Sequence, residues 1–225
     1  WSSDVCSSDL RNLRTKLPLQ RTMNKTGAQS ERATQTFSTN VILVDADHVD
    51  DVVLNLTANF ERMLNRRLPK ADLPRWLNCL ALDGGLRPGN NAIQVIFLHK
   101  KENQALKHFV PAHYANDLDG KAFTDSLGEF TLHSAAVPEL SSSEEMFLHT
   151  LDELLKSATT ERLMIVGDMD SEETAAAIKR CIAQAPQQKS ITLFAMEPVA
   201  GRGFMQEILG YSLMNALGIK GSEFA

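Results

Sequence analysis

Two apolar segments that each end in paired aspartates constrain the fold of this chain most strongly. Residues 41–47 read Val-Ile-Leu-Val-Asp-Ala-Asp, and residues 163–170 read Leu-Met-Ile-Val-Gly-Asp-Met-Asp. A run of four aliphatic residues is typical of a strand buried on both faces, as in a parallel sheet between layers of helices. In such sheets, ligands and catalytic groups gather at the carboxyl ends of the strands. We therefore expect both aspartate pairs to lie at functional strand ends.

The rest of the sequence alternates between helical and strand patterns. We predict further strands at 92–98, around 130–132 and at 191–196. We predict a helix that begins at Asp50 or Asp51 and ends at about Arg67, and further helices at 72–81, 142–155, 172–185 and 204–217. Strands that alternate with helices predict an α/β fold, a three-layer α/β/α sandwich with a mostly parallel sheet. Residues 99–119 give no clear pattern.

The sequence divides at about residue 40. Residues 1–40 are polar and lack periodicity, so we predict a disordered leader, and residues 1–10 look like a translated sequencing adapter. Residues 41–220 contain no linker-like segment. We therefore expect a single α/β domain over 41–220.

The composition limits the classes of partner. The net charge of −5 and the pI near 5.7 provide no overall attraction to nucleic acid or to anionic membranes, so a polyanion would need a local patch. The three cysteines lack metal-ligand spacing, and no apolar run approaches the roughly 20 residues of a membrane helix. We predict a cytoplasmic protein with no membrane contact. The apolar face of 204–217 can pack on the sheet or on a second copy, which leaves a homo-oligomer open.

Four aspartates converge at one edge of the sheet if the two acidic strands are neighbours, namely Asp45, Asp47, Asp168 and Asp170. Carboxylates at such short range repel and raise one another's pKa values. A hard divalent cation, Mg²⁺ or Mn²⁺, removes this repulsion and can lower the pKa of a bound water for attack at phosphorus. Asp152 is a fifth candidate metal ligand, because it borders the apolar face of its predicted helix.

The same residues also have a simpler explanation. Aspartate is frequent after strands because it caps the helix that follows, and Asp50, Asp51 and Asp170 could serve only that purpose. Capping is the better interpretation of a single Asp-x-Asp pair. The repetition at two strand ends is what favours a metal site.

The two acidic strand ends resemble a known nuclease group. Val44-Asp-Ala-Asp-His48 resembles the end of the first strand in the NYN branch of the PIN-like nuclease superfamily, and Gly167-Asp-Met-Asp170 is similar to that branch's second acidic strand end. Asp152 stands on the preceding helix, about where the family carries another acid. The resemblance implies a PIN-like fold with Rossmann-like topology and a Mg²⁺- or Mn²⁺-dependent ribonuclease acting on RNA. Its catalytic residues would be Asp45 and Asp168, and its metal ligands Asp45, Asp47, Asp152, Asp168 and Asp170.

Three positions depart from the nuclease pattern. His48 replaces an Asn, Val166 replaces a Ser, and Ser171 replaces a Phe. These changes bear on the positioning of substrate more than on metal binding. Residues 60–98 also resemble an uncharacterised bacterial family of unknown function, which supplies no chemistry.

Two alternative functions use the same chain. Residues 45–49 also resemble the nucleophile motif of haloacid dehalogenase-like phosphatases, and residues 167–172 their late acidic motif. Asp45 would then be the phosphorylated nucleophile and Asp47 the general acid. The usual glycine-containing turn does not follow Asp45, and no motif places the required lysine, for which Lys121 and Lys156 are candidates. The second alternative, which the acidic pI favours, is an inactive module that binds RNA or protein.

Overall fold

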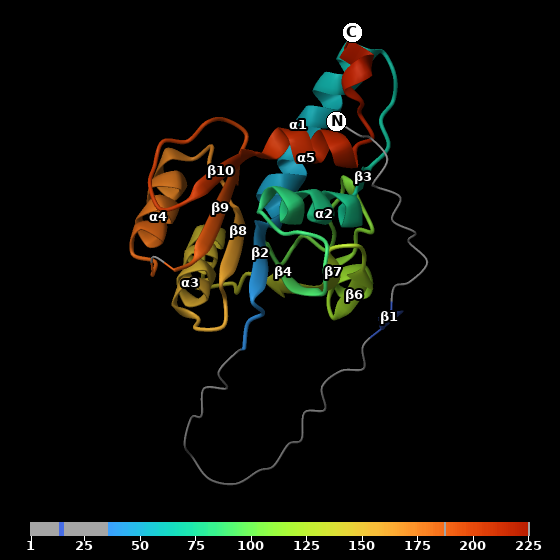
Figure 1. Ribbon diagram of the computed structural model, residues 1–225. Helices are drawn as coiled ribbons and strands as arrows, with labels where there is room; N and C mark the ends of the chain where they lie inside the picture. The colour runs from blue at the N-terminus through green and yellow to red at the C-terminus, as the bar shows by residue number, and fades with distance from the viewer. Residues whose placement is uncertain (1–13, 16–35, 187, 225) are drawn as a thin grey trace.

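A sheet of eight strands forms the centre of the computed structural model, which describes residues 14–15, 36–186 and 188–224 (Figure 1). Its strands are β1 (Arg14–Thr15), β2 (Asn40–Asp45), β4 (Asn91–His99), β6 (Lys121–Thr124), β7 (Gly128–Ala136), β8 (Arg162–Val166), β9 (Ser190–Ala195) and β10 (Met205–Ile208). Most of the expected leader, including its adapter-like start, lies outside the described residues.

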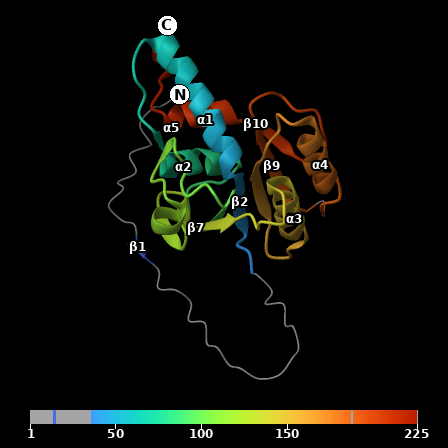
Figure 2. The ribbon, with the colours of Figure 1, turned by 180° about the vertical axis from the view of Figure 1, so that it is seen from behind.

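Six of these strands are parallel and follow the order β7-β4-β2-β8-β9-β10. Numbered along the chain, this order is 3-2-1-4-5-6, the order of the doubly wound nucleotide-binding fold. Figures 1 and 2 show β2 in the middle, with β4 and β7 on one side and β8 to β10 on the other. β6 and β1 extend the β7 edge in antiparallel fashion.

The residues of β2 alternate between two helical layers, as the pleat of a strand requires. Ile42 and Val44 pack into the layer of α1 (Ala46–Leu64), α2 (Leu73–Asp83) and α5 (Leu209–Ala216). Val41 and Leu43 pack into the layer of α3 (Ser143–Lys156) and α4 (Glu172–Ala183). All four side chains are fully buried. The predicted three-layer sandwich with a mostly parallel sheet is therefore confirmed.

Local signals fix the starts of two helices where the sequence predicts them. Asp72 caps α2 by accepting a hydrogen bond from the backbone N–H of Arg75 at 3.0 Å, and Pro74 lies in the first turn. Ser142 and Glu145 form the predicted capping box of α3. These two interactions set the point at which α3 enters its layer.

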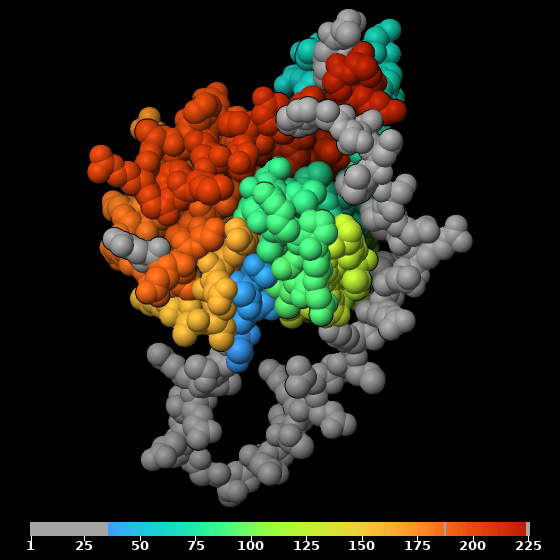
Figure 3. Space-filling view, in the orientation of Figure 1, coloured from blue at the N-terminus to red at the C-terminus, as the bar shows by residue number. Residues whose placement is uncertain are grey.

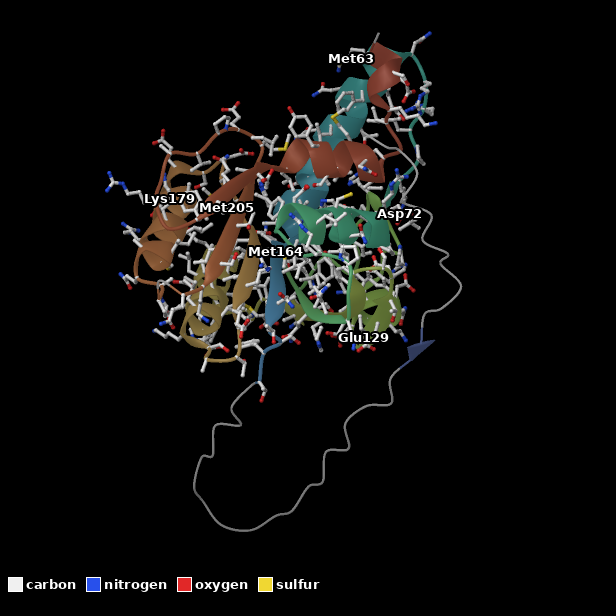
Figure 4. The ribbon with its side chains drawn as sticks, in the orientation of Figure 1. Met63, Asp72, Glu129, Met164, Lys179 and Met205 are labelled. Atoms are coloured by element: carbon white, nitrogen blue, oxygen red, sulfur yellow. The ribbon has the colours of Figure 1, made fainter. Side chains whose placement is uncertain are left out.

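The glycine pair that follows α2 allows close packing of the helix end against the sheet. A Cβ atom at Gly84 would lie 2.5 Å from Sδ of Met164, a fully buried residue of β8. Figure 4 shows Met164 in the middle of the molecule, beside α2. The turn predicted at Gly84 and Gly85 therefore also serves core packing.

The predicted start of α1 is wrong. The helix begins at Ala46, and not after Asp50 or Asp51, because Oδ1 of Asp45 accepts a hydrogen bond from the backbone N–H of His48 at 3.1 Å. It ends at Leu64 rather than near Arg67, and the next residue has a left-handed backbone conformation.

The predicted closing helix at 204–217 divides into a strand and a shorter helix. Backbone pairing with β9 holds residues 205–208 in the extended β10, and only then does α5 begin. Side-chain periodicity does not reveal this pairing, because it depends on a distant strand. α5 packs on α2, where the indole N–H of Trp76 donates to Oγ of Ser212 at 3.2 Å.

Two further segments differ from the sequence expectations. β7 spans nine residues instead of a short stretch around 130–132 and pairs with β4 along its whole length. Within 99–119 lie β5 (Phe109–Val110), which pairs with β3 (Ala71–Asp72), and a π-helical turn η2 (Tyr114–Leu118). Apolar residues of this segment pack on the α1 face of the sheet.

The C-terminal end packs against the far end of α1. A 3₁₀ turn, η3 (Gly221–Phe224), places Glu223 beside Arg66, with 2.7 Å between Oε1 and Nη2. Figure 3 shows the red atoms of the C-terminal end against the teal atoms of this part of the chain. Among the helices of the described residues, none combines the length and apolar character needed to cross a membrane.

Candidate functional site

β2 and β8 are adjacent parallel strands, and the strand order reverses between them. Val44 lies opposite Val166 in the register, so the residues that follow both strands leave the sheet at the same edge. In doubly wound sheets this switch point is where a crevice for ligands opens. The neighbouring acidic strand ends that the sequence analysis required are therefore present.

Asp45 is the last residue of β2 and is also the N-cap of α1. Burial raises the pKa of this carboxyl, and the negative charges of Asp47 and Asp168 raise it further, whereas the hydrogen bond from His48 N–H opposes the shift. The expected extended Asp-x-Asp geometry does not persist, because Asp47 already belongs to the helix. Asp45 thus holds a negative charge that the fold does not fully compensate.

Asp168 also uses one carboxylate oxygen for the local chain. Its Oδ1 accepts hydrogen bonds from the backbone N–H groups of Asp170 at 3.0 Å and Ser171 at 3.1 Å, and Ser171 in turn caps α4. In the part of the chain that the structure describes, Oδ2 of Asp168 and Oδ2 of Asp45 accept no hydrogen bond. The capping explanation thus accounts for one oxygen of each carboxylate and leaves the other available.

His48 connects the two strand ends. Its Nδ1 atom lies 3.5 Å from Oδ1 of Asp168, and its side chain is 14% exposed. One donor atom from each of His48, Asp168 and Asp170 lies within 4.8 Å of the other two. Only small side-chain movements would bring these atoms to the roughly 2 Å bond lengths of a common divalent cation. The donor set therefore fits a metal, and its imidazole suits Mn²⁺ better than Mg²⁺, which takes oxygen ligands.

His48 and Asp168 line a cavity of about 330 Å³, which we call the site pocket, whereas Asp170 is not among its lining residues. Its walls come from the ends of β2, β4 and β8 and from the first turns of α1, α3 and α4. The lining residues are Asp45, Asp47, His48, Asp51, Lys100, Ser143, Glu144, Phe147, Asp168 and Thr174. Carboxylates predominate, so an anionic substrate would need a cation to enter.

Gly167 determines how closely α3 approaches the pocket. A Cβ atom at this position would lie 2.9 Å from the ring of Phe147 and 2.9 Å from Cδ1 of Ile178. Because Phe147 belongs to the first turns of α3, the glycine allows that end of the helix to pack directly on the end of β8. Glu144 reaches the pocket from the same turn.

Asp47 holds the loop after β4 with both of its carboxylate oxygens, so it is a poor candidate for a metal ligand. Its Oδ2 accepts a hydrogen bond from the backbone N–H of Lys100 at 2.7 Å, and its Oδ1 accepts one from the side-chain amide of Asn103. Asp50, one turn later in α1, accepts from the backbone N–H groups of Lys107 at 3.0 Å and His108 at 2.8 Å. The two acids together attach the 100–108 segment to α1.

The structure does not bring Asp152 to the site pocket. Its carboxylate pairs with Lys156 at 2.5 Å, its side chain is 43% exposed, and it is not among the pocket-lining residues. Only the first turns of α3 lie beside the strand ends, and Asp152 comes later in the helix. Glu144 is the acid of this helix that lines the pocket.

The pocket residues that were not candidates in the sequence analysis include His48, Lys100, Glu144 and Thr174. His48 had a signal, because a residue three positions after a helix cap is in the first turn and lies near that cap. The other three come from segments whose approach to β2 is set by tertiary packing.

Residues 34–224 match DUF6621, a family of unknown function, and the chain belongs to that family. No curated protein and no solved structure matches it. The expected membership of an uncharacterised family is thus confirmed, whereas the likeness to the NYN and PIN-like nucleases stays a prediction.

Proposed function

Because membership of a family of unknown function assigns no reaction, we propose from the site pocket that this protein is a divalent-metal-dependent ribonuclease. The observation that carries the proposal is the cluster of His48, Asp168 and Asp170 donors within 4.8 Å beside Asp45, at the point where the strand order reverses. A local cap explains one oxygen of each aspartate. It does not explain why His48, Asp45 and Asp168 all line one pocket.

The metal would be held by His48, Asp168 and Asp170, with Asp45 beside them. A bound Mn²⁺ or Mg²⁺ supplies Lewis acidity and a water of lowered pKa, the chemistry that phosphodiester hydrolysis needs. The resemblance of 44–48 and 167–170 to the NYN nucleases supports RNA as the substrate.

Asp45 is suited to accept a proton from the attacking water. Its carboxyl has a raised pKa because it is buried and lies near other acids, and Asp45 lines the pocket with only its Oδ1 engaged in a hydrogen bond to a described residue. A base whose pKa is raised towards the working pH transfers protons more effectively than an ordinary aspartate. This role concerns Asp45 alone and leaves metal binding to the other three residues.

The contacts of Asp47 favour the nuclease over the phosphatase. A haloacid dehalogenase-like mechanism requires the acid two residues after the nucleophile to give a proton to the leaving group. Both oxygens of Asp47 already accept hydrogen bonds from the loop after β4, from Lys100 and Asn103. An acid held as an acceptor on both oxygens is poorly placed for that role.

The test is cleavage of a labelled single-stranded RNA in Mn²⁺ by the wild-type protein, by Asp168→Asn and by Asp152→Asn. We expect wild type and Asp152→Asn to cleave equally and Asp168→Asn to lose at least about 100-fold, the size of effect seen when a catalytic group is removed. Asp152→Asn is the matched control, because it makes the same chemical change outside the site pocket. Turnover of a phosphomonoester instead of RNA would favour the phosphatase, and no turnover of either by a folded protein would favour the inactive binding module.

A further inference from the structure

Lys100 stands where three cavities meet. It follows the last residue of β4 and lines the site pocket, a cavity of about 160 Å³ beside α1 and a larger one of about 680 Å³. We call the largest the α3 cavity, because it lies between residues 100–102 and the turn that leads into α3, residues 137–143. The two largest of these cavities share both Lys100 and Ser143, so they adjoin.

The backbone of Lys100 is fixed on both sides. Its N–H donates to Oδ2 of Asp47 at 2.7 Å, and its carbonyl oxygen lies 2.9 Å from Nδ1 of His99. His99 is itself buried and stacks on the ring of Tyr114, with 3.8 Å between the ring centroids. The fold thus holds the main chain of Lys100 rigidly while its side chain is exposed at the junction.

The ammonium group of Lys100 makes no ion pair with any described residue. Its neighbour Lys101, in contrast, pairs with Glu139 on the far wall of the α3 cavity. Among the described residues that line the site pocket, Lys100 is the only lysine or arginine, beside five carboxylates. A cation that is available among so many acids is placed to contact an anionic substrate.

We propose that Lys100 binds the phosphate next to the scissile one in a single-stranded polynucleotide that runs from the site pocket into the α3 cavity. The proposal rests on the proposed function and names its substrate as a continuous single strand rather than a mononucleotide. The α3 cavity lies within the range of roughly 300–1,000 Å³ typical of small-molecule pockets, enough for about one nucleotide but not for a duplex. Its serine hydroxyls and its apolar residues Val137 and Pro138 suit a sugar and a base.

The experiment compares wild type, Lys100→Gln and the matched control Lys70→Gln on a fluorescent single-stranded RNA of eight to twelve nucleotides in Mn²⁺, over a series of KCl concentrations. The readout is KM where the RNA is cleaved and Kd by fluorescence anisotropy where it stays intact, so loss of hydrolysis alone does not prevent the test. Both glutamines keep the backbone N–H groups, and we expect unchanged melting temperatures.

For Lys100→Gln we expect KM or Kd to rise about 5- to 10-fold with kcat nearly unchanged, and the salt slope of log affinity to fall by about 0.7, the value for one phosphate contact on a single strand. Lys70→Gln should change affinity less than about two-fold, because Lys70 is exposed and lines none of the three cavities. Equal salt slopes for wild type and Lys100→Gln would overturn the proposal. So would equal losses in the two variants, or no binding by wild type.

Discussion

His48 and Asp168 come from opposite sides of the switch point, and Nδ1 of the histidine lies 3.5 Å from Oδ1 of the aspartate. The histidine belongs to the first turn of α1 and the aspartate to the loop after β8. The pairing of β2 with β8 brings the two residues together, and this contact is the core of the proposed metal site.

We expect Asp45→Asn to stabilise the metal-free protein. Asparagine keeps an oxygen that can cap α1 but removes a buried charge beside Asp47 and Asp168. In excess chelator, the melting temperature should rise by about 3 °C, which corresponds to about 1 kcal/mol for a chain of this size. The control Asp51→Asn, at an exposed position of the same helix, should differ little from wild type. A lower melting temperature for Asp45→Asn would contradict the expected repulsion between the Asp45 carboxylate and those of Asp47 and Asp168.

Gly167→Ala should destabilise the fold and disturb the pocket together. The new methyl group would press on the ring of Phe147 and on Ile178, and overpacking of this kind costs about 1–3 kcal/mol. Urea denaturation measures the loss, with Gly221→Ala as the control because a Cβ atom there meets no neighbour within 4 Å. Equal urea midpoints for Gly167→Ala and Gly221→Ala would show that the end of β8 tolerates a side chain at residue 167.

The core of this fold could be predicted from sequence because its signals are local. Four consecutive aliphatic residues in β2 indicate burial on both faces, and the Ser142–Glu145 capping box marks the start of α3. The adjacency of β2 and β8 is only a condition in the sequence analysis, and their parallel pairing in the structure fulfils it.

The rest depends on contacts between distant segments. The 100–108 segment looks irregular in sequence, because its order comes from hydrogen bonds to Asp47 and Asp50 in α1. Its position beside an apolar helix face makes Asp152 a candidate in the sequence, whereas the acid that lines the pocket, Glu144, lies in the helix turn nearest the strand ends. Periodicity identifies the buried face of a helix but not which of its turns meets a site.

Asp50→Ala should loosen the 100–108 segment. The substitution removes an acceptor from the backbone N–H groups of Lys107 and His108, and we expect a loss of about 3–6 kcal/mol for two hydrogen bonds to a charged group. Hydrogen exchange should accelerate at these two amides more than in β4. Asp51→Ala is the control on the exposed side of the helix. Equal exchange rates at the two amides in both variants would show that Asp50 does not anchor the 100–108 segment.

A separate carboxyl far from the pocket should make stability depend on pH. Desolvation and the charge of Glu207 raise the pKa of Asp83 to about 6. The folded state then holds this proton more tightly than the unfolded state, so its contribution to stability falls as pH rises from about 4 to about 6. Asp83→Asn removes this dependence, and its melting temperature should rise relative to wild type between pH 4 and 7. A constant difference across that range would contradict the prediction.

The most direct test of the central claim is the melting temperature of wild type, Asp168→Asn and Asp152→Asn with and without excess Mn²⁺. A cation bound only by the folded protein stabilises it by about 2.7 kcal/mol at a concentration 100 times its Kd. We predict that Mn²⁺ raises the melting temperatures of wild type and Asp152→Asn alike, by an amount that grows with metal concentration, and leaves Asp168→Asn unchanged. Equal shifts in all three proteins, or no shift in wild type, would contradict a metal site between β2 and β8.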